Sequence, residues 1–221
     1  MERGLWSRVG PIAGVLFVAA FFAAFAVIGV AGPDWVSPGA PAGEIAAYLE
    51  EQRDALGIAP AVLLGLAVVL FVVFLADLHQ RYRQAIPETS RWLATTFLSG
   101  GLLVAAGVLI QVALQAGAWA IADFGDNVQA AVALHAVTAN AGIVAMPGLV
   151  LLTGAAATAS FRFRALPRWL GVLAVIALLV AIVQYWVPVW LLWALGAAIV
   201  LLVNPRAVDA SHTPQRAAAP D

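Results

Sequence analysis

Long apolar stretches, separated by short polar or proline-containing segments, are the main pattern of this chain. An α-helix needs about 20 mostly apolar residues to cross the hydrocarbon core of a bilayer. The pattern therefore predicts an all-α fold, a polytopic transmembrane helix bundle with six spans. We place these spans at 9–31, 56–78, 92–121, 127–160, 169–185 and 188–203.

The first and last apolar stretches need a closer argument. The stretch 9–31 is longer than the apolar core of a signal peptide, so we expect an uncleaved first span. The block 169–203 would exceed about 50 Å as one helix, so we break it at 185–188. Residues 1–204 then form one transmembrane domain, and we expect 205–221, rich in alanine and proline, to be a disordered cytoplasmic tail.

Two local features modify these spans. Between the first two spans, Ile45, Tyr48 and Leu49 recur at helical spacing opposite Glu50 and Glu51. This pattern predicts one short interfacial helix over 44–54, lying on the membrane surface in the first outer loop. The fourth span contains Pro147, which removes a backbone donor and should kink the helix.

Arginine placement predicts the orientation. All arginines except Arg53 fall on one side of the predicted spans, and cytoplasmic loops are enriched in basic residues. Tryptophans fall near both predicted boundaries, as in the aromatic belts of membrane proteins. The prediction is N-in and C-in, in the cytoplasmic membrane.

The composition supports a membrane protein and excludes several chemistries. Hydrophobic residues make up 63% of the chain and charged residues 10%, far from a soluble domain. Without cysteine or lysine, the chain has no thiolate ligand and no Schiff-base amine. His79, His135 and His212 fall at different depths, so we expect no metal ion and no cofactor. No basic domain exists to bind nucleic acid.

A few polar residues interrupt the spans, where polar side chains are costly and therefore candidates for function. Gln111 and His135 both lie about 13–15 Å inward from the predicted loop 123–126, so adjacent helices could pair them. One interpretation is a ligand pocket in the outer half, between spans three and four, with His135 as its proton acceptor or as a ligand contact. The other is that these groups hydrogen-bond one another across helices. The candidate residues are Gln111, Gln115, His135, Thr138, Asn140 and Gln184.

Other polar patterns have plainer explanations. Asp77 and Arg81 are one helical turn apart, and we expect them to pair at the inner interface. The two inner loops share the order arginine, aromatic, arginine, then proline and Arg-Trp-Leu, at 81–93 and 162–170. Either these hairpins are duplicated, or the inner interface favours the same residues twice.

Three short motifs carry a family resemblance: Gly-Glu-Ile-Ala-Ala-Tyr-Leu-Glu at 43–50, Phe-Leu-Ala-Asp-Leu at 74–78 and Leu-Pro-Arg-Trp-Leu at 166–170. With them, most of the chain resembles the uncharacterised six-span integral membrane proteins common in actinobacteria. That resemblance implies the six-span fold and no activity.

The sequence leaves three function classes, in this order. The first is a non-enzymatic accessory or partner-binding subunit, because the spans hold few polar groups. The alternative is a small-solute or lipid permease that uses the polar pocket. An enzyme comes last. The expected partners are the lipid bilayer and either another membrane protein or a second copy of this chain.

Overall fold

The computed structural model describes residues 3–123, 128–183 and 189–204, and within these ranges the chain is helical, without a strand. This confirms the all-α prediction for the described part. In chain order the elements are α1 (Arg3–Ala31), α2 (Ala42–Leu56), α3 (Ala59–Ala85), η1 (Glu88–Ser90), α4 (Trp92–Asp123), α5 (Val128–Ala141), η2 (Gly142–Ala145), α6 (Met146–Phe163), α7 (Arg168–Val183) and α8 (Val189–Val203). The candidate residue Gln184 and the predicted tail 205–221 lie outside the described residues.

Four helical segments in the described ranges are long and apolar enough to cross a membrane: Arg8–Ala31, Ala59–Ala85, Glu88–Ile121 and Val128–Phe163. Many large apolar side chains on their surfaces, such as Leu66, Val69 and Leu103, are exposed. Apolar surface of this extent needs lipid around it, which indicates a membrane protein. α7 and α8 are apolar too but shorter, with 16 and 15 residues.

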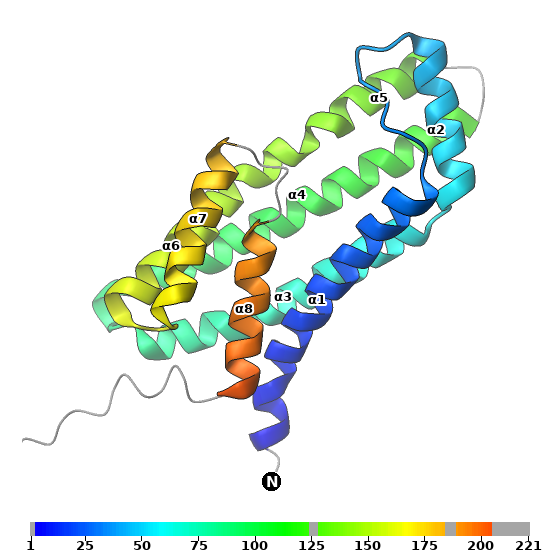
Figure 1. Cartoon of the computed structure of the whole chain (residues 1–221). Coiled ribbons are helices and arrows are strands. Elements are labelled where there is room, and N and C mark those ends of the chain that lie inside the picture. Colours follow the sequence, from blue (N-terminus) through cyan, green and yellow to red (C-terminus); the bar gives the residue numbers. More distant parts are fainter. Residues whose placement is uncertain (1–2, 124–127, 184–188, 205–221) are drawn as a thin grey trace, which may run out of the picture.

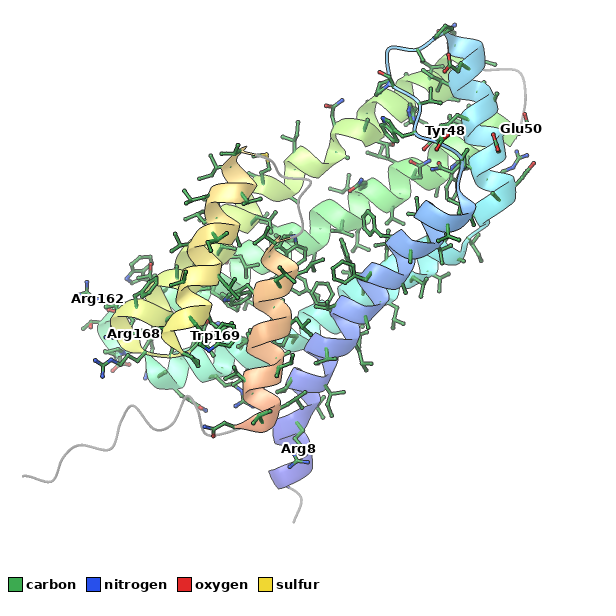
Figure 2. All side chains as sticks on the ribbon, in the orientation of Figure 1. Arg8, Tyr48, Glu50, Arg162, Arg168 and Trp169 are labelled. Atoms are coloured by element: carbon green, nitrogen blue, oxygen red, sulfur yellow. The ribbon has the colours of Figure 1, made fainter. Side chains whose placement is uncertain are left out.

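The long helices run side by side along the molecule (Figure 1). α1 packs on α3, α4 packs on α3, α5 and α6, and α7 and α8 pack on each other and on α6 and α1. α2 covers one end of this bundle, whereas α7 and α8 lie beside the other half. Figure 2 places Tyr48 and Glu50 at the first end, here called the α2 end, and Arg8, Arg162 and Arg168 at the opposite, arginine-rich end.

Small residues bring α4 and α6 into close contact. A Cβ atom added at Gly148 would lie 2.7 Å from the Gly100 carbonyl oxygen and 2.8 Å from the Val104 amide nitrogen. At Gly107, an added Cβ would lie 2.9 Å from Cβ of Ala145. Close backbone approach of this kind stabilises helix pairs in membranes, where lipid is as apolar as the side chains.

An aromatic cluster joins α8 to α1 and α3. The ring of Phe17 lies 4.7 Å from that of Phe71 and 5.6 Å from that of Trp190, centroid to centroid. Trp193, one turn further along α8, is fully buried and faces Phe97 of α4. α8 is therefore packed into the bundle.

The helix containing Pro147 is interrupted, as the sequence predicted. α5 ends at Ala141, the 3-10 segment η2 follows, and α6 begins one residue before Pro147. Proline fits the first turn of a helix, where its missing N–H has no intrahelical partner. The break therefore separates α5, at the α2 end, from the tightly packed α6.

Candidate functional site

A cavity of about 290 Å³ lies inside the bundle at the α2 end. One part of its wall is apolar, and the other part is polar and aromatic. Apolar side chains of α1, α3 and α4 form one part, including Phe21, Phe25, Leu64 and Val108. Polar and aromatic side chains form the other part: Trp35, Tyr48, Gln52, Gln111, Gln115, Trp119, His135 and Thr138. No lining residue carries a formal charge.

The structure brings four of the six sequence candidates together. Gln111 and Gln115 line the cavity from α4, and His135 and Thr138 line it from α5. Within the described chain no hydrogen bond joins Gln111 to His135, so the expected direct pair does not form. Asn140 is exposed, and its side-chain amide donates to the Ala136 carbonyl at 2.8 Å.

Helical geometry explains why Asn140 is separate. Asn140 follows His135 by five residues, which at about 100° per residue turns it about 140° away. Its hydrogen bond to the backbone four residues earlier is a local one. Asn140 therefore does not belong to the cavity.

The apolar face of α2 covers the polar part of the cavity. Ile45 and Leu49 are fully buried, and they pack with Ala118 of α4 and Ala131 of α5. The sequence predicted this helix but placed its apolar face on the membrane surface; the structure buries that face against the protein. Gly57, at φ 53°, ends α2 and lets α3 begin two residues later.

A hydrogen-bond network joins α2 to α4. Oε1 of Gln52 accepts from Nε2 of Gln115 at 2.9 Å and from Nε1 of Trp119 at 3.2 Å. Nε2 of Gln52 donates to the Tyr48 hydroxyl at 2.8 Å. Gln52 is only 8% exposed and uses both ends of its amide. The burial of Gln52 could have been predicted from the sequence, because this polar residue falls in line with the apolar face of α2. Its hydrogen-bond partners could not have been predicted.

The ring of His135 contacts two aromatic side chains, Trp35 and Tyr48, which also contact each other at 6.1 Å between ring centroids. Ring centroids are 5.2 Å apart for Trp35 and His135 and 5.4 Å apart for Tyr48 and His135. Nε2 of His135 lies 3.2 Å from the carbonyl oxygen of Val36. A carbonyl only accepts, so Nε2 carries the hydrogen and donates. In the neutral ring Nδ1 is then a hydrogen-bond acceptor.

Two buried polar atoms of α5 have no hydrogen-bond partner in the described chain. They are Nδ1 of His135, a residue 1% exposed, and the hydroxyl of Thr138, one turn further along the helix. An unsatisfied buried polar atom costs about 1–3 kcal/mol. Other hydroxyls of the same long helical segment avoid this cost, because Thr153, Thr158 and Ser160 each donate to a carbonyl four residues earlier.

Tyr48 lies between the cavity and an acidic groove. The groove, of about 540 Å³, shares Tyr48 with the cavity and contains Asp34, Glu44 and Glu51. Burial raises the pKa of the Tyr48 hydroxyl, and the hydrogen bond from Gln52 lowers the pKa by a smaller amount. The hydroxyl is therefore protonated at neutral pH. Within the described ranges, no three His, Asp or Glu side chains are arranged to hold a metal ion.

Three polar residues near the arginine-rich end, Asp77, His79 and Arg81, have hydrogen-bond partners. Nε of Arg81 donates to Asp77 at 2.8 Å, which confirms the predicted pair. Nδ1 of His79 donates to the Ala94 carbonyl at 2.9 Å. The buried hydroxyl of Tyr82 and Nε1 of Trp193 have no partner in the described chain, but neither residue lines the cavity. The cavity at the α2 end, which brings several polar side chains together, is therefore the candidate site.

Comparisons with protein-family models, with curated proteins and with solved structures find no match to this chain. The resemblance to six-span actinobacterial membrane proteins therefore stays a prediction.

Proposed function

We propose that this chain is a multi-pass protein of the cytoplasmic membrane that binds an uncharged amphiphilic small molecule in the cavity at the α2 end. One observation carries the proposal. The cavity wall is apolar on one side and polar on the other, and it has no charged residue. Such a wall complements a molecule with an apolar body and a neutral polar head.

The orientation is part of this proposal. Arg8, Arg162 and Arg168 lie at the end opposite Glu50, and basic residues favour the cytoplasmic side. The α2 end is then outside. α7 and α8 span about 24 and 22 Å at 1.5 Å per residue, less than the roughly 30 Å hydrocarbon core. We keep the prediction that α7 and α8 each cross the membrane. If the two helices instead entered the membrane and returned to the same side, the end of α8 would still lie inside.

The cavity then lies in the outer half of the membrane. Counted along α1 from Arg8, Phe21 and Phe25 are about 20 and 26 Å from the arginine-rich end. Counted back from Phe163, Thr138 and His135 are about 38 and 42 Å away. With a hydrocarbon core of about 30 Å, the apolar wall faces the outer leaflet, and the part of the polar wall formed by His135 and Thr138 is at headgroup depth. An amphiphile is oriented in the bilayer in the same way.

A cavity-filling substitution tests this function. Ala139 lines the cavity, whereas Ala133 on the same helix is exposed. Molecules that co-purify with the wild type, with Ala139→Phe and with Ala133→Phe are extracted and identified by mass spectrometry. We expect an uncharged amphiphile with the wild type and with Ala133→Phe, and its loss from Ala139→Phe. Equal recovery from all three proteins, or recovery of charged lipids alone, would overturn the proposal.

A permease is the second candidate, because η2 interrupts the helix that carries His135 and Thr138. A mid-helix 3-10 segment often marks a functional hinge. Release of an entrapped amphiphile from proteoliposomes tests this candidate. Release that is equal for the wild type, Gln111→Leu and His135→Ala, with folding intact, would remove it. Binding without transport would favour the accessory-subunit prediction.

A further inference from the structure

Two glutamines of α4 line the cavity with amide atoms that have no partner in the described part of the protein. We propose that the ligand has a neutral head with an O–H or amide N–H group, which donates to Oε1 of Gln115 and accepts from Nε2 of Gln111. The inference rests on the proposed function and deepens it, because it names the chemistry of the head group.

The neighbours of Gln115 determine how its amide is oriented. The indole of Trp119 only donates, so the atom of Gln52 that it reaches at 3.2 Å is the amide oxygen. The same oxygen lies 2.9 Å from the amide of Gln115, which must therefore present its NH₂ group to Gln52. Oε1 is then the free end of the Gln115 amide. It is not among the buried atoms without a partner, so it is open to a water-sized molecule.

Gln111 has no hydrogen bond to the described residues, and both of its amide atoms are open to a water-sized molecule. Leu102 and Leu109 are exposed on the outer side of α4. At about 100° per residue, Gln111 is turned about 180° from Leu102 and about 160° from Leu109. Its accessible amide therefore lies on the side of α4 that faces the cavity, and Gln111 is part of the cavity wall.

One small head group can reach both amides. Gln111 and Gln115 are one helical turn apart, so their Cβ atoms lie about 5–6 Å from each other. A hydroxyl has both a hydrogen and lone pairs on one oxygen, and a carboxamide has an N–H group beside a carbonyl oxygen. Ethers and N,N-dialkyl amides have no hydrogen to donate. They would displace water from Oε1 of Gln115 without replacing its hydrogen bond, which lowers affinity.

The depth of the two glutamines matches that of a lipid head group. Counted along α4 from Trp92, Gln111 and Gln115 lie about 28 and 34 Å away. In the proposed orientation they are therefore near the outer boundary of a hydrocarbon core about 30 Å thick. Phe25 of α1 lines the cavity and is also 46% exposed. The apolar wall therefore continues onto the outer surface of the bundle, where the alkyl chain of the ligand meets lipid.

Photolabelling of the full-length protein in phosphatidylcholine nanodiscs tests the inference. Four probes share one long alkyl chain with a diazirine near its tail, and they differ in the head: an alcohol, its methyl ether, a primary amide and its N,N-dimethyl amide. We expect the alcohol and the primary amide to label the α1 peptide containing Phe21 and Phe25 about tenfold more than their donor-free partners do, because those partners leave one hydrogen bond unmade. The more effective donor identifies the head as an alcohol or an amide.

Methionine variants separate binding from folding, because methionine keeps the length of glutamine and removes the amide. In Gln115→Met, Gln52 still accepts from Trp119, so α2 should stay docked, which hydrogen exchange of α2 checks. We expect this variant to label equally with both members of each probe pair. Gln111→Met should label less with all four probes and keep the preference for donors. Gln129→Met, exposed on α5 and outside the cavity wall, is the matched control and should label as the wild type does.

The outcomes distinguish the two proposals. Equal labelling by the members of both pairs in the wild type would overturn the donating head and would leave amphiphile binding intact. Absence of labelling by all four probes, with the protein folded, would overturn the proposed function as well. A preference for donors that persists in Gln115→Met would overturn the role of its Oε1, and labelling of Gln111→Met at the wild-type level would overturn the contact with Gln111.

Discussion

His135 of α5 and Val36, in the segment that connects α1 to α2, are joined by a hydrogen bond of 3.2 Å from ring Nε2 to the backbone carbonyl. They are 99 positions apart in the chain. This bond holds the connecting segment beside α5, and it also determines that Nε2 is the ring nitrogen that carries the hydrogen. One contact therefore links the covering of the site to its chemistry.

Gln52→Leu should loosen α2 from α4. The substitution leaves the side chains of Gln115 and Trp119 without their acceptor, at a cost of about 1–3 kcal/mol. Hydrogen exchange over 44–56 measures the docking of α2, and we expect faster exchange there than in the wild type. Glu51→Leu, at the exposed neighbouring position, is the control and should exchange as the wild type does. Unchanged protection in Gln52→Leu would show that apolar packing alone holds α2.

Gly148→Ala should destabilise the α4–α6 pair. Its new Cβ would meet the backbone at Gly100 and Val104, and overpacking costs about 1–3 kcal/mol. Thermal unfolding in detergent measures the effect as a lower Tm. Gly154→Ala on the same helix meets nothing within 4 Å, so its better helix propensity should leave stability unchanged or raise it by up to about 1 kcal/mol. Equal Tm values for the two variants would contradict the close packing.

Single cysteines should report the orientation, because the natural chain contains none. We expect Asp54→Cys, exposed on α2, to react with a membrane-impermeant maleimide in intact cells. Arg83→Cys, exposed at the other end of α3, should react only after permeabilisation. The reverse pattern would invert the proposed topology, and labelling of both in intact cells would contradict a membrane between them.

Alkaline pH should weaken the docking of α2 through Tyr48. Burial raises the pKa of this hydroxyl in the folded protein, so the folded state holds its proton above the usual value of about 10. The stabilisation is present in full below about pH 10 and is lost as pH rises toward the folded pKa. Absorbance titration in a Tyr82→Phe, Tyr185→Phe background measures Tyr48 alone. Ionisation at the value of free tyrosine would contradict the burial of Tyr48 between α2 and the bundle.

The sequence by itself determined the helical membrane character and much of the site. The length of an apolar stretch is a local property of the sequence, so the long helices could be predicted. The break in the helix near Pro147 could be predicted as well, because proline removes a backbone donor. Helical periodicity also placed Gln111, Gln115, His135 and Thr138 where they share one cavity. The predicted equal depth of Gln111 and His135 assumed that their two helices are adjacent and antiparallel, and α4 and α5 do pack on each other.

Only the tertiary structure decided what these residues contact. Gln52 reaches Gln115 across 63 positions, and Val36 reaches His135 across 99. Periodicity shows that a helix has an apolar face but not which surface covers it, because lipid and a neighbouring helix are equally apolar. The face of α2 could therefore have rested on the membrane. Its docking on α4 and α5 brings four polar residues that are scattered along the sequence into the wall of one covered cavity.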